Sequence, residues 1–131
     1  YLESLINVID YFIVDVKLLD EKQCRNILGG DISIYFKNVE RLYASGKLKQ
    51  FRIPCCKEFV FTENNQELIL TFLKQYHDVP VQIFKIHTLG ESKYKSLNRT
   101  MWQGETIKDI ELENFKTKLT ENYIQAEIIQ I

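Results

Sequence analysis

The sequence predicts an α/β fold, a partial (half) TIM-like barrel in which three to four mostly parallel strands alternate with crossover helices. Three short apolar segments that end in ionisable side chains predict the strands, at residues 12–17, 48–54 and 81–90. Amphipathic stretches of helical length separate these segments, and parallel strands require such crossover connections. The 131 residues are interpreted as one domain, 1–131.

The first two predicted strands carry polar and apolar side chains on opposite faces. Because side chains alternate along a strand, Ile13, Asp15 and Lys17 share one face, and the apolar residues between them share the other. By the same rule, Gln50 and Arg52 share one face of the second strand. In a barrel the helices cover the outside, and ligand-binding groups lie where strands end. The polar side chains are therefore expected to point into the interior.

The third predicted strand adds a cation and an imidazole. Alternation places Lys85 and His87 opposite Phe84 and Ile86. This assignment predicts that Lys85 points into the interior beside His87. There Lys85 would recruit an anionic group of a substrate, or it would form a salt bridge with Asp15.

Capping residues and apolar residues at helical spacing predict the helices between the strands. Asp31 is the predicted N-cap of the first crossover helix, and Gly46 ends it. Asn64 or Asn65 can cap the second helix, before Pro80 forces an extended exit. The remaining predicted elements are the end of a helix at 2–11, a helix from about 109 to 121 and a closing strand at 126–131.

Composition excludes several classes of protein. Seventeen basic and eighteen acidic residues give a net charge of −1, so no global electrostatic argument favours nucleic acid or an anionic membrane as a partner. No apolar run in the sequence is long enough to cross a bilayer. The three cysteines, an odd number without regular spacing, argue against a disulfide framework and fit a reducing cytoplasm.

Three short motifs in order make the chain resemble the C-terminal half of a radical S-adenosylmethionine (SAM) enzyme that activates glycyl radical enzymes, such as the pyruvate formate-lyase activating enzymes. The resemblance covers nearly the whole chain. Each motif is weak alone, but their order and helix-sized separations are much harder to obtain by chance. The matching residues are Asp15, Val16 and Lys17, then Arg52 before Ile53 and Pro54, then His87, Leu89, Gly90, Lys93 and Tyr94.

This resemblance implies that Asp15, Lys17, Arg52 and His87 bind SAM. Lys17 and Arg52 suit its carboxylate, Asp15 would hold the methionyl end or the ribose, and His87 would contact the nucleoside. The implied reaction is reductive cleavage of SAM by a [4Fe-4S] cluster, followed by removal of a hydrogen atom from a glycine of a partner protein. The implied partners are a glycyl radical enzyme similar to pyruvate formate-lyase and an electron donor such as flavodoxin or ferredoxin.

The cysteines of this chain do not have the spacing that such a cluster needs, which is three cysteines separated by three and by two residues. We therefore expect the cluster-binding residues in an N-terminal half outside this sequence, and we expect this part alone to be inactive. The loops at 55–64 and 98–106 depart from the family pattern. The alternative function, a radical SAM enzyme that acts on another peptide substrate, therefore stays open.

Readings without radical chemistry also stay open. Asp15 and Lys17 could form only a structural ion pair. The chain could be a non-catalytic α/β binding or interaction module. It could also belong to another barrel enzyme, in which Lys17 forms a Schiff base.

Overall fold

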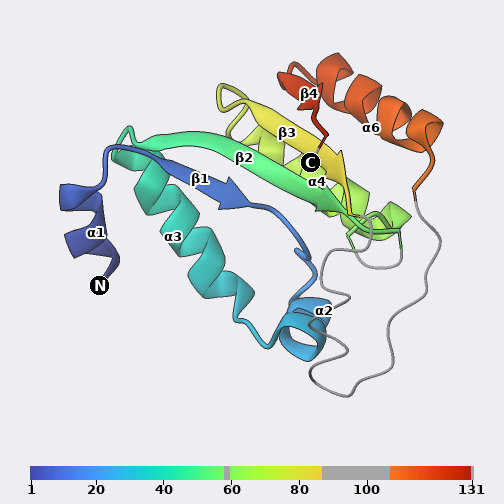
Figure 1. The fold of residues 1–131 in the computed structure, drawn as a ribbon. Helices are drawn as coiled ribbons and strands as arrows, with labels where there is room; N and C mark the ends of the chain where they lie inside the picture. The colour runs from blue at the N-terminus through green and yellow to red at the C-terminus, as the bar shows by residue number, and fades with distance from the viewer. Residues whose placement is uncertain (58–59, 87–106, 131) are drawn as a thin grey trace.

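The computed structural model describes residues 1–57, 60–86 and 107–130, which form a sheet with helices (Figure 1). The sheet has four strands in the order β1-β2-β3-β4, and every neighbouring pair is parallel. Consecutive strands are thus neighbours, each reached through a helical crossover, as in successive units of an α/β barrel. The predicted fold class is confirmed. The strands are β1 (Phe12–Asp15), β2 (Leu48–Cys55), β3 (Val81–Lys85) and β4 (Ala126–Ile128).

Helices precede the sheet and connect its strands. None of the helices in the described part of the chain is long and apolar enough to cross a membrane. The short α2 and the π-helical segment η1 lie between β1 and α3. The helices are α1 (Leu2–Val8), α2 (Glu21–Gln23), η1 (Cys24–Leu28), α3 (Ile32–Ala44), α4 (Glu63–Lys74) and α6 (Asp109–Glu121).

The predicted caps of α3 are confirmed, whereas that of α4 is wrong. The Asp31 carboxylate accepts a hydrogen bond from the Ser33 backbone amide at 2.9 Å. Gly46 follows α3 with a φ of 77°, a left-handed conformation that glycine adopts at little cost. At the start of α4 the N-cap is Thr62, whose hydroxyl accepts from the Asn65 backbone amide at 3.3 Å. The Asn65 side chain is therefore available for other contacts.

A single hydrophobic cluster joins one face of the sheet to the helices. Phe51 and Ile53 of β2 have no exposed surface, and they alternate with the partly exposed Arg52. The Phe51 ring contacts Phe72 of α4, with ring centroids 5.5 Å apart in an edge-on arrangement. Phe115 of α6 is 2% exposed and belongs to the same cluster. This packing leaves the polar side chains of the strands on the opposite face.

Candidate functional site

A row of polar side chains crosses the sheet on the face opposite the helices. Asp15 of β1 is in register with Arg52 of β2, Arg52 with Gln82 of β3, and Gln82 with Glu127 of β4. The Gln82 side-chain amide donates a hydrogen bond of 2.7 Å to the Glu127 carboxylate. The shared polar face predicted for the first two strands is confirmed, and the register of Asp15 with Arg52 is a new finding. Gln82 and Glu127, which sequence reasoning did not select, extend the row across the sheet.

Asp15 and Lys17 form a loose ion pair at the carboxyl end of β1. The Lys17 ammonium lies 3.8 Å from the Asp15 carboxylate, and about half of each side chain is exposed, 47% for Lys17 and 51% for Asp15. An ion pair this exposed contributes little to stability, because water competes for both groups. Both groups can therefore turn towards a ligand at small cost.

Arg52 is held against an aromatic ring. Its guanidinium carbon lies 5.0 Å from the centroid of the Phe84 ring, and Phe84 itself is 7% exposed. The Arg52 Nε is buried and has no hydrogen-bond partner within the described ranges. An arginine that stacks on a ring and keeps an unused donor suits recognition of a carboxylate.

The structure corrects the predicted faces of β3. Phe84 is in register with Pro54 and lies on the same side as Arg52, whereas Lys85 is in register with the buried Cys55. The Lys85 ammonium forms an ion pair with Asp109 at the start of α6, and not with Asp15. This pairing lowers the pKa of Asp109, first through the hydrogen bond from Lys85 and then through its charge. Lys85 therefore joins a helix to the sheet.

His87, the fourth residue predicted to bind SAM, lies outside the described residues. The structure thus brings together Asp15, Lys17 and Arg52. The binding roles of all four residues stay predictions.

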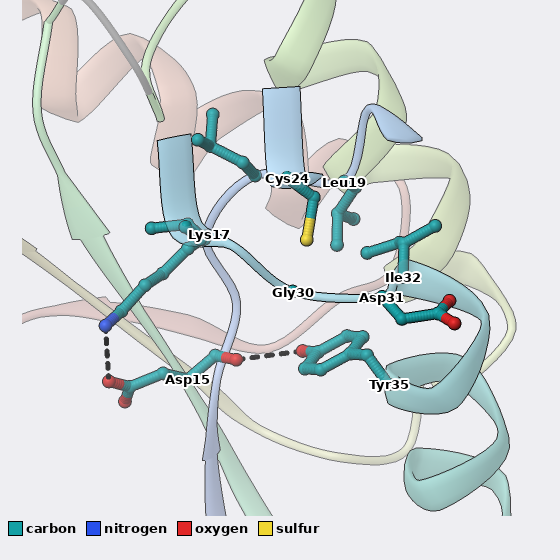
Figure 2. A pocket seen from close by; sticks show the side chains of 10 residues that line it. Asp15, Lys17, Leu19, Cys24, Gly30, Asp31, Ile32 and Tyr35 are labelled. Carbon is teal, nitrogen blue, oxygen red and sulfur yellow. Dashed lines mark hydrogen bonds and ion pairs between the residues drawn. The ribbon is translucent and has the colours of Figure 1, made fainter. Parts of the chain in front are cut away.

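A cavity of about 290 Å³ adjoins Asp15 and Lys17 at the carboxyl end of β1. Figure 2 shows Lys17 reaching back towards Asp15, while the Cys24 sulfur projects between Leu19 and Gly30. The segment after β1, η1 and the start of α3 form its walls. Its lining residues are Asp15, Lys17, Leu18, Leu19, Cys24, Leu28, Gly30, Asp31, Ile32 and Tyr35.

Tyr35 of α3 fixes the end of β1. Its hydroxyl donates a hydrogen bond of 2.8 Å to the Asp15 carbonyl oxygen, as Figure 2 shows. Burial raises the pKa of the Tyr35 phenol, and the nearby charge of Asp15 adds to this effect. The phenol therefore stays protonated and remains a donor at neutral pH. In the sequence, Tyr35 carried no signal beyond its place on an amphipathic helix.

The cysteines of this chain do not fit an iron–sulfur cluster. Cys24 and Cys55 are buried, and Cys56 is half-buried. Burial raises the pKa of the Cys55 thiol to about 12, whereas cluster ligands are thiolates. The described ranges contain no group of three or more His, Cys, Asp or Glu residues that could hold a metal ion.

Comparison with known proteins identifies relatives of one kind. No family model matches the chain. It is 28% identical over 99 residues to the benzylsuccinate synthase activating enzyme of Thauera aromatica, a match that covers 74% of this chain and 30% of that protein. It is 26% identical to the trans-4-hydroxy-L-proline dehydratase activating enzyme of Clostridioides difficile, with 89% of this chain and 43% of that protein covered. The chain is a homologue of the activating enzymes of glycyl radical enzymes.

Two further matches agree with this relationship. The pyruvate formate-lyase 2-activating enzyme of Escherichia coli K12 is 24% identical, over 73% of this chain and 33% of that protein. A solved domain of the pyruvate-formate lyase-activating enzyme from Bacteroides vulgatus superposes with a TM-score of 0.76 at 17% identity, and the match covers 98% of this chain and 73% of that one. The solved domain shows that the fold is shared. This chain spans 30–43% of the length of the curated relatives that it matches.

Proposed function

We propose that this chain is the SAM-binding part of a radical SAM activating enzyme that generates a glycyl radical on a partner protein. The observation that carries the proposal is that Asp15 and Lys17, at the carboxyl end of β1, lie next to Arg52 in the second half of β2. The relatives of the chain are activating enzymes. Ligand sites of barrel folds lie at that end of the strands.

The three residues offer what the methionyl end of SAM requires. The Arg52 guanidinium presents a planar fork to the carboxylate, and the Phe84 ring behind it restricts its motion. Lys17 adds a compact positive charge from the segment after β1, and Asp15 is an acceptor for the ammonium group. In the proposal, His87 contacts the nucleoside. Together these groups orient the sulfonium but carry out no chemistry themselves.

The radical chemistry is assigned to groups outside these residues. SAM and a [4Fe-4S] cluster would supply reductive cleavage and hydrogen-atom removal from a glycine. Because the cysteines present do not fit the cluster, its ligands are assigned to another part of the protein. The proposed electron donor is a flavodoxin or ferredoxin in the cytoplasm. These residues alone would then bind ligand without turning it over.

The proposed partner is a glycyl radical enzyme similar to pyruvate formate-lyase. The fold shared with a domain of a pyruvate-formate lyase-activating enzyme and the sequence match to the Escherichia coli relative support this choice. Other relatives are named for benzylsuccinate synthase and trans-4-hydroxy-L-proline dehydratase, so the test must include more than one partner class.

The test expresses the complete natural protein anaerobically and measures SAM affinity by equilibrium dialysis. We expect Lys17→Met and Arg52→Gln each to lower the affinity at least about tenfold, since each removes a charge-assisted contact. Lys22→Met, at an exposed position of α2, is the matched control and should bind as the parent does. Electron paramagnetic resonance of reduced mixtures with candidate partners should then show a glycyl radical. Unchanged affinity in both variants would overturn the assignment of the site.

A further inference from the structure

One polar side chain is completely buried in the described part of the chain. Asn65, in the first turn of α4, has no exposed surface, whereas its neighbour Asn64 is exposed. A buried amide is costly unless its donors and acceptor find partners. The contacts of Asn65 therefore indicate what the residue does.

Asn65 bonds to backbone groups of two other segments. Its side-chain oxygen accepts a hydrogen bond from the Leu19 amide at 3.0 Å. Its side-chain nitrogen donates to the Lys17 carbonyl oxygen at 2.8 Å and to the Val60 carbonyl oxygen at 2.7 Å. Both donors are used, and the acceptor is used once. Asn65 thus joins α4 to the segment after β1 and to the segment after β2.

The bonds fall where the chain leaves β1 and turns towards α2. Lys17 and Leu19 are separated by one residue, and Asn65 binds one backbone group of each. Tyr35 binds the Asp15 carbonyl oxygen from α3. The backbone that carries Asp15 and Lys17 is therefore fixed at two points, at Asp15 by α3 and at Lys17 by α4. The Lys17 side chain itself is left half-exposed.

We propose that Asn65 is a positioning residue. It clamps the backbone of residues 17–19 so that the Lys17 side chain is presented beside Asp15, the strand neighbour of Arg52, at the ligand-binding end of the sheet. The identity of the ligand rests on the proposed function, whereas the clamp rests on the hydrogen bonds alone. Asn65 contacts no ligand in this proposal and acts through Lys17.

A merely structural role for Asn65 makes different predictions. If the side chain only stabilised the start of α4, its loss would lower stability throughout the protein but leave ligand affinity unchanged in folded molecules. A clamp predicts selective loosening of residues 17–19 and a loss of affinity that depends on Lys17. Amide hydrogen exchange distinguishes local opening from global unfolding. A double-mutant cycle measures the dependence on Lys17.

The experiment compares Asn65→Leu, which has similar volume and none of the bonds, with Asn65→Asp, which keeps only the acceptor. Asn64→Leu and Asn64→Asp are the matched controls at the exposed neighbour. In the complete natural protein, amide exchange of residues 17–19 is measured first. Affinity for S-adenosylhomocysteine, an unreactive probe with the same amino acid and nucleoside groups, is then measured with and without Lys17→Met.

In Asn65→Leu we expect exchange at residues 17–19 to accelerate at least about tenfold more than exchange in β2 and β3, and probe affinity to fall at least about tenfold. In the Lys17→Met background, the same substitution should cost at most about twofold. Exchange that accelerates equally everywhere, with affinity unchanged, would overturn the proposal.

Two further outcomes separate this proposal from the proposed function. If the parent protein binds no probe, the proposed function fails, and the exchange of residues 17–19 alone decides whether the clamp exists. If the Asn65 variants do not fold, amide hydrogen exchange in the parent protein decides whether the clamp exists. Protection of the Leu19 amide equal to that of core strand amides supports the clamp, and exchange as fast as in exposed loops refutes it.

Discussion

The guanidinium carbon of Arg52 lies 5.0 Å from the centroid of the Phe84 ring, on the face of the sheet opposite the helices. The two residues come from neighbouring strands, in which Phe84 pairs with Pro54, two positions beyond Arg52. The ring therefore supports the guanidinium next to Asp15, the strand neighbour of Arg52 on its other side.

Phe84→Leu should lower SAM affinity about fivefold while the protein stays folded. Leucine keeps an apolar side chain at this buried position but removes the aromatic face, and a cation–π contact contributes about 1 kcal/mol. Equilibrium dialysis of the complete protein measures the change. Phe36→Leu, at a partly exposed position of α3, is the control and should bind as the parent does. Equal affinities for both variants would show that the ring does not orient Arg52.

Arg52→Lys should not preserve the site, although it preserves the charge. Lysine cannot present a planar fork to a carboxylate, and its ammonium stacks less well on a ring. We expect SAM affinity to fall at least about tenfold, as much as in Arg52→Gln. The reciprocal variant Lys17→Arg should lose less, because Lys17 acts as a point charge in a half-exposed position. Full affinity in Arg52→Lys would mean that only charge is needed at this position.

Tyr35→Phe should lower the free energy of unfolding by about 1 kcal/mol. The substitution removes the hydroxyl that donates to the Asp15 carbonyl oxygen, and the ring can stay in place. Urea denaturation at neutral pH measures the difference. Tyr11→Phe is the control. Tyr11 is 51% exposed, and loss of its hydroxyl should change the free energy of unfolding by less than about 0.5 kcal/mol. An unchanged midpoint in Tyr35→Phe would show that water replaces this bond without loss.

Sequence patterns predicted the regular elements well because their causes are local. The N-cap of α3 at Asp31 follows from a capping group, and the extent of α6 follows from helical periodicity; neither needs knowledge of the tertiary fold. The alternation in β1 and β2 was also sufficient, because Asp15 and Arg52 each stand between apolar neighbours. The pairing of these two residues then follows from a parallel register.

The remaining features depend on contacts between distant segments. In β3, apolar residues occupy both faces, so alternation alone could not decide whether Phe84 or Lys85 faces the helices. Lys85 lies on the helix side, where its ammonium pairs with Asp109, a residue 24 positions later in the sequence. Asn65 was interpreted as a helix cap, because asparagine often is one, but its amide instead binds backbone 46 and 48 positions earlier.

The buried thiol of Cys55 should make stability fall as the pH rises above 9. Burial raises its pKa from 9.0 to about 12, so the folded protein keeps a proton that the unfolded chain releases between these values. Below pH 9 the thiol is protonated in both states, and its contribution is fully present. Above pH 9 the unfolded state binds fewer protons, and the free energy of unfolding falls by up to about 1.4 kcal/mol per pH unit until pH approaches the folded value.

Cys55→Ala and Cys55→Val remove this titration, and urea denaturation from pH 8 to 10.5 measures the slope. The two variants leave different space in the core, so their stabilities should differ at every pH. Their slopes above pH 9 should agree with each other and should be flatter than that of the parent, by about 1 kcal/mol per pH unit at pH 10. Parallel curves for parent and variants would show that the Cys55 thiol ionises in the folded protein as readily as in the unfolded chain.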